Sequence, residues 1–81
     1  ETYYVQREFS AALPVFQMVV DRYPESAKLP DALLKVGYCN YELGQFGEAE
    51  NVLQRVARDF PATTAARLAT QRLEAMILEQ G

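Results

Sequence analysis

The residue types that most often carry acid–base, nucleophilic and metal chemistry are nearly absent from this sequence. It contains no histidine and a single cysteine, Cys39, so the thiol has no imidazole to activate it and zinc has no set of nitrogen and sulfur ligands. The carboxylates are scattered without the spacing of a calcium loop, and no glycine-rich phosphate loop occurs. We therefore expect no catalytic residue, no metal site and no cofactor. Cys39 lies in an apolar-periodic stretch and is expected to pack as a small hydrophobic residue.

Charge and hydropathy argue against nucleic acid and membranes. The net charge is −3 and the eight basic residues are spread along the chain, so we expect no basic patch for phosphate backbones or anionic lipid. The longest apolar runs, such as Met18 to Val20, are far shorter than the ~20 residues that span a bilayer. Apolar residues make up 49% of the sequence, which is typical of a folded globular chain.

An internal repeat indicates which elements position the side chains. One block occurs twice at an offset of 37 residues, and the matched pairs include Phe9 with Phe46, Val15 with Val52, and Pro24 with Pro61. Within each copy the apolar residues recur at intervals of three and four, which predicts an amphipathic helix. Each copy ends in an aromatic residue followed by proline, which stops a helix.

The full pattern predicts four helices and no strand, with the helices at about 7–22, 30–43, 46–59 and 64–79. Gly44 is expected to close the second helix in the left-handed conformation, and Thr63 or Thr64 to cap the start of the last one. Pro14 falls inside the first helix, so that helix either starts later or bends; the unbroken periodicity favours a bend. The buried stripe of the last helix is predicted to comprise Ala66, Ala69, Leu73, Ile77 and Met76.

The spacing of six residues resembles the tetratricopeptide-repeat (TPR) consensus: Gly37, Gly44, Phe46, Ala49, Leu53 and Pro61. Small residues at Gly37 and Ala49 would let the two helices of a repeat approach closely. The resemblance implies an all-α solenoid of antiparallel helix pairs that binds proteins. The end of one repeat would occupy residues 1–24, a full repeat residues 30–61, and a capping helix residues 64–80.

The linker in residues 23–32 reads YP-x-S-x-x-x-P-x-A, which resembles the C-terminal TPR domain of the YbgF/CpoB family of the bacterial Tol-Pal system. This resemblance implies a periplasmic location, TolA as partner, and a role in coupling peptidoglycan synthesis to outer-membrane constriction at division. It also implies a signal peptide and a trimerising coiled coil upstream of Glu1. Other envelope TPR proteins, including outer-membrane assembly lipoproteins, share this linker and are the alternative.

The TPR resemblance also implies a concave groove lined by the first helix of each repeat. The outward-turned candidates of the 30–43 helix for protein binding are Asp31, Leu34, Lys35, Tyr38, Tyr41 and Glu42. Tyrosine is enriched at interfaces because it offers a large contact area and a hydroxyl group. Two alternatives stay open: Tyr38 and Tyr41 pack between repeats, and Lys35 and Glu42 serve only solubility.

Self-assembly is a further alternative to partner binding. If no helix covers the first helix, Phe9, Phe16 and Val20 would be left partly uncovered. An apolar patch of this kind favours association with a second copy of the chain.

Overall fold

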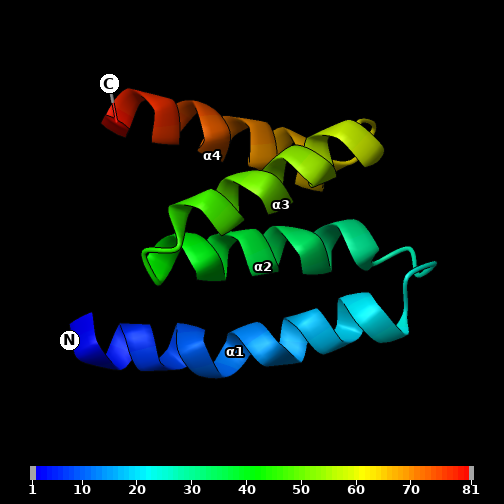
Figure 1. Ribbon diagram of the computed structural model, residues 1–81. Helices are drawn as coiled ribbons and strands as arrows, with labels where there is room; N and C mark the ends of the chain where they lie inside the picture. The colour runs from blue at the N-terminus through cyan, green and yellow to red at the C-terminus, as the bar shows by residue number, and fades with distance from the viewer. Residues whose placement is uncertain (1, 81) are drawn as a thin grey trace.

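The computed structural model is an antiparallel stack of four helices; it describes the backbone of residues 2–80 and the side chains of residues 7–79 (Figure 1). The helices are α1 (Thr2–Arg22), α2 (Leu29–Glu42), α3 (Phe46–Asp59) and α4 (Thr64–Gln80). No strand occurs in the described backbone, so the predicted all-α class is confirmed. The predicted bounds of the last three helices agree with the structure to within a residue.

The first helix begins five residues earlier than predicted, and the repeat explains why. Gly44 ends α2 with a φ of 80°, and its counterpart one offset earlier is Arg7. Arginine pays a steric cost in the left-handed conformation, so the chain at Arg7 continues as helix. Pro14 lies within this continuous helix, so the alternative of a later start is wrong.

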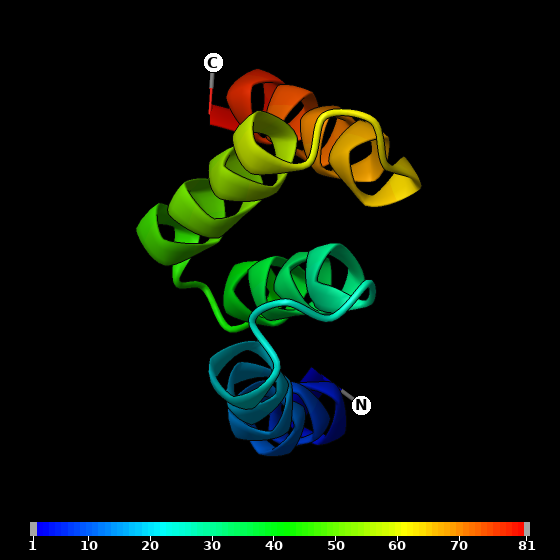
Figure 2. The same ribbon diagram turned by 90° about the vertical axis from the view of Figure 1, so that its right-hand side faces the viewer.

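The central helix of the stack is α2. It packs against α1, α3 and α4, whereas the backbones of α1 and α3 do not pack against each other (Figure 2). Nine residues of α2 are buried, compared with three of α3. The hydrophobic core therefore surrounds α2, and its buried members are Leu29, Leu33, Leu34, Ala49, Leu53, Val56, Ala65, Ala66, Ala69 and Met76.

Close packing of α2 on α3 depends on a residue without a side chain. A Cβ atom added to Gly37 would lie 2.7 Å from Leu53 Cδ2 and 2.9 Å from Leu53 Cγ, closer than packed carbon atoms approach each other. Leu53 and Ala49 are completely buried in the same interface. The small residues predicted to allow a close approach do so, because Gly37 leaves the space that Leu53 fills.

The helix ends are satisfied by local hydrogen bonds. At the end of α2, Gly44 N–H donates to the Tyr41 carbonyl at 3.0 Å, and Gln45 N–H donates to the Asn40 carbonyl at 2.8 Å. These two bonds form a Schellman motif, which requires the left-handed residue that Gly44 supplies. At the start of α4, the Ala66 N–H donates to Thr63 Oγ1 at 3.1 Å, so Thr63 is the N-cap of the two predicted candidates, Thr63 and Thr64.

One residue of the predicted buried stripe of α4 is exposed. Ile77 is 66% exposed, whereas its neighbour Met76 is 2% exposed. Successive helix residues project about 100° apart, so the buried stripe of α4 continues through Met76 and leaves Ile77 outside it. Phe46 is 47% exposed because it is the first residue of α3, where its ring packs edge-on against Tyr41 with the centroids 5.4 Å apart.

Candidate functional site

Two aromatic rings of α2 and one cation of α4 line one side of the stack. The Arg72 guanidinium carbon lies 4.9 Å from the Tyr38 ring centroid and 5.1 Å from the Tyr41 ring centroid. A cation at this distance from an aromatic face is attracted by the ring quadrupole. Beside this cluster lies a hollow of about 330 Å³, which we call the α2–α4 groove; it is lined by Tyr38, Leu68, Gln71, Arg72 and Ala75.

The hydroxyl group of Tyr41 ties the end of α2 to the end of α4. It donates a hydrogen bond to Glu79 Oε1. This bond, with smaller contributions from burial and from the nearby Glu79 charge, raises the pKa of Tyr41 above its usual value. Through this hydrogen bond Tyr41 joins the α2 wall to the α4 wall.

The six predicted groove residues have different surroundings. Asp31, Lys35 and Glu42 are exposed. Tyr38 and Tyr41 are half-buried against the core cluster and against α4, which is the packing predicted as one alternative, and part of each side chain remains open to solvent.

Leu34 was predicted to turn outward, and this prediction is wrong. The residue is 5% exposed and belongs to the core cluster. It lies on the part of α2 that faces other helices, because α2 is covered on three sides.

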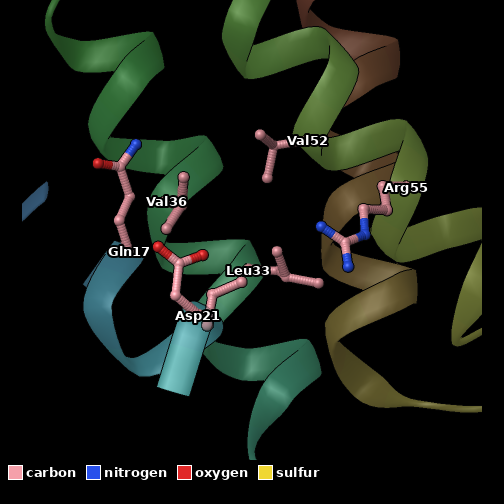
Figure 3. Close-up of a pocket in the computed structure, with 7 residues that line it drawn as sticks. Gln17, Asp21, Leu33, Val36, Val52 and Arg55 are labelled. Carbon is pink, nitrogen blue, oxygen red and sulfur yellow. The ribbon is translucent and has the colours of Figure 1, made fainter. Parts of the chain in front are cut away.

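A second hollow lies on a different side of α2, and we call it the α1–α3 pocket (Figure 3). It has a volume of about 370 Å³ and an apolar floor of Leu33 and Val36 from α2 and Val52 from α3. Its polar residues are Gln17 and Asp21 of α1 and Arg55 of α3. Figure 3 shows the Asp21 carboxylate and the Arg55 guanidinium on opposite sides of this floor.

The chain's one thiol lies outside both hollows. Cys39 is 3% exposed, and burial raises its pKa while the charge of Lys35 acts in the opposite direction. A buried thiol of this kind is poorly ionised and is a weak nucleophile. Among the described residues no group of three or more histidine, cysteine or carboxylate side chains could hold a metal ion. No helix in the described part of the chain is long and apolar enough to cross a bilayer.

A comparison with protein families agrees with this architecture. A family model described as tetratricopeptide repeat matches residues 1–26 and 31–63, which is more than half of the chain. The chain belongs to the tetratricopeptide-repeat family. No curated protein matches it significantly. TPR repeats generally mediate protein–protein interaction and form a non-catalytic fold.

The α4 wall of this TPR groove was missed at the sequence level. Leu68, Arg72, Ala75 and Glu79 recur at intervals of three and four, so they share one face of the helix. That signal was available, but the last helix was interpreted as a cap with one buried stripe. The interhelical contacts of Arg72 and Glu79 show that this second stripe is a wall of the groove.

Proposed function

We propose that the α2–α4 groove binds a segment of a partner protein and that this TPR domain is a scaffold without a catalytic role. The observation that carries the proposal is Arg72, held against the rings of Tyr38 and Tyr41 beside an open hollow. Tyrosine and arginine are enriched among the residues that dominate protein interfaces, because both bring a large surface and hydrogen-bonding capacity. Packing on the core orders the rings in advance, which reduces the entropy lost when a partner binds.

For the identity of the partner, we propose a segment of TolA in the bacterial periplasm. The support is the resemblance of the linker in residues 23–32 to the YbgF/CpoB family, whose role couples peptidoglycan synthesis to outer-membrane constriction. The alternative is that this chain is part of another envelope TPR protein, such as an outer-membrane assembly lipoprotein, because those proteins share the linker.

Both levels of the proposal are tested by titrating the domain with purified TolA segments and following binding by calorimetry. Tyr38→Ala removes a half-buried ring from the groove, and the loss of an interface anchor of about 2 kcal/mol would weaken binding roughly 30-fold. Arg58→Ala is the matched control, because its side chain is 72% exposed on α3 and lies outside both hollows.

The outcomes separate the two levels. Undiminished TolA binding by a folded Tyr38→Ala variant would show that the groove is not the binding site. If no TolA segment binds the folded wild-type domain, the Tol-Pal assignment is wrong. The groove proposal is then tested with the same pair of variants under the alternative that this chain is part of another envelope TPR protein.

A second candidate function is self-association through α1. It is favoured by Val15, which is 53% exposed, and Met18, which is 47% exposed, on the same helix as the half-buried Phe9 and Phe16. Light scattering over a range of concentrations tests it. A dimer that the double variant Val15→Glu and Met18→Glu abolishes would support it, and a monomer at all concentrations would exclude it.

A further inference from the structure

The α1–α3 pocket is separate from the α2–α4 groove. The two hollows share no residue. Val36 lines the first and Tyr38 the second, and residues two apart on a helix project about 200° apart around its axis. A ligand in one hollow therefore leaves the other accessible.

The polar groups of the α1–α3 pocket have hydrogen-bonding capacity to spare. Asp21 and Arg55 form no ion pair with each other, and they come from different helices, α1 and α3. Arg55 Nε forms an ion pair with Asp59 Oδ2 at 3.8 Å, a distance too long for a hydrogen bond. Asp59 instead accepts a hydrogen bond from Arg58 Nε at 3.0 Å. The Arg55 guanidinium thus keeps donors for a ligand, and the Asp21 carboxylate faces it across the floor (Figure 3).

We propose that the α1–α3 pocket is a second protein-docking site, which receives one apolar side chain of a partner peptide. A basic side chain on one side of that residue pairs with Asp21, and an acidic side chain on the other side pairs with Arg55. The apolar floor of Leu33, Val36 and Val52 matches the central side chain, and the two opposite charges match the flanking ones. A peptide fits better than a free small molecule, because small-molecule sites enclose most of their ligand and this hollow is open on one side.

The energetic division between these parts follows from their exposure. Asp21 and Arg55 are both exposed, so each charge pair contributes little affinity and chiefly selects the partner's charge pattern. Burial of the central side chain supplies most of the attraction.

The test uses three labelled alanine-based helical peptides with a central leucine. One carries a lysine and a glutamate on the two sides of the leucine, one carries two glutamates and one carries two lysines. Binding is measured by fluorescence anisotropy, and the site is located from the amide shifts of Val20, Val36 and Val52 in NMR spectra. We expect the mixed peptide to bind about two- to five-fold more tightly than either of the others, the range for one exposed ion pair.

Charge-reversal variants should change this preference in opposite directions. Asp21→Lys is expected to favour the two-glutamate peptide, and Arg55→Glu the two-lysine peptide. Arg67→Glu makes the same change on α4, outside the pocket and away from Arg55 and Asp59, so it should keep the wild-type preference. Circular dichroism checks that each variant is folded, which is expected because all three side chains are exposed.

Several results would overturn the proposal. It is wrong if none of the peptides binds, or if a peptide with alanine in place of the central leucine binds equally well. It is also wrong if the amide shifts are confined to the Leu68 side of the molecule, or if the charge-reversal variants keep the wild-type preference among the peptides. Shifts of the same pocket amides with protein concentration alone would assign the pocket to a second copy of this chain, and would also reject a peptide partner.

Discussion

Replacing Gly37 by alanine tests how closely α2 and α3 must approach. The new Cβ would lie 2.7 Å from Leu53 Cδ2, and Leu53 is completely buried and has no solvent into which to move. Overpacking of this kind costs about 1–3 kcal/mol, while alanine in a helix interior gains about 1 kcal/mol over glycine. The net expectation is a destabilisation of up to about 2 kcal/mol, and each kcal/mol lowers the melting temperature of a domain of this size by about 4–8 °C.

The same substitution at two other glycines provides matched controls. Gly47 is the second residue of α3 and a Cβ there would meet nothing within 4 Å, so Gly47→Ala should stabilise the domain by up to about 1 kcal/mol. Gly44 also has open space around it, but its φ is 80°. Gly44→Ala should therefore cost about 1–2 kcal/mol through backbone strain alone.

Urea unfolding followed by far-UV circular dichroism measures all three variants in one series. The expected order of stability is Gly47→Ala above the wild type, and the wild type above the other two. A Gly37→Ala variant at least as stable as Gly47→Ala would refute the argument that Leu53 occupies the space at Gly37. Equal stability of Gly44→Ala and Gly47→Ala would refute the argument from the left-handed backbone.

Two further substitutions probe the polar contacts. Thr63→Ala removes the oxygen that caps Ala66 N–H and should cost about 1 kcal/mol in urea unfolding, whereas Thr64→Ala should have a much smaller effect; equal losses would contradict the assignment of the cap. The pKa of Tyr41 is raised in the folded state above its unfolded value of about 10. The contribution of Tyr41 to the free energy of unfolding is therefore present below the unfolded pKa, and it is lost as the pH rises through the folded pKa. The wild type should therefore lose more stability between about pH 9 and 12 than Tyr41→Phe, and parallel pH profiles of unfolding would argue against the Glu79 hydrogen bond.

The repeat made most of the fold predictable. Apolar residues at intervals of three and four, aromatic–proline stops and Gly44 all act locally, so the sequence places α2, α3 and α4 nearly where the structure has them. The start of α1 was predicted five residues too late. The signal for it is that the first copy has Arg7 where the second copy has the helix-ending Gly44. Ile77 was wrongly assigned to the buried stripe because Met76 and Ile77 are both apolar and adjacent. Near a helix end the sequence alone does not show which of the two faces the neighbouring helix.

The groove was less predictable than the fold, since it depends on contacts between helices. Helical spacing assigns Leu34 and Tyr38 to one side of α2, but it does not show which of them α4 will cover. In the structure Leu34 is covered completely and Tyr38 only in part. Likewise, nothing in the sequence separates Arg72 from the other surface arginines; only the position of α4 beside two tyrosine rings does so.

The central position of α2 has a kinetic consequence. Every pair of touching helices is either consecutive or, for α2 and α4, separated by a single helix, so native contacts join segments that are near in the chain. Closing short loops costs little entropy, and helical proteins with such local topology reach the native state in microseconds to milliseconds. Growth can begin at the α2–α3 hairpin and add an outer helix on either side in either order, without any segment waiting for a remote partner.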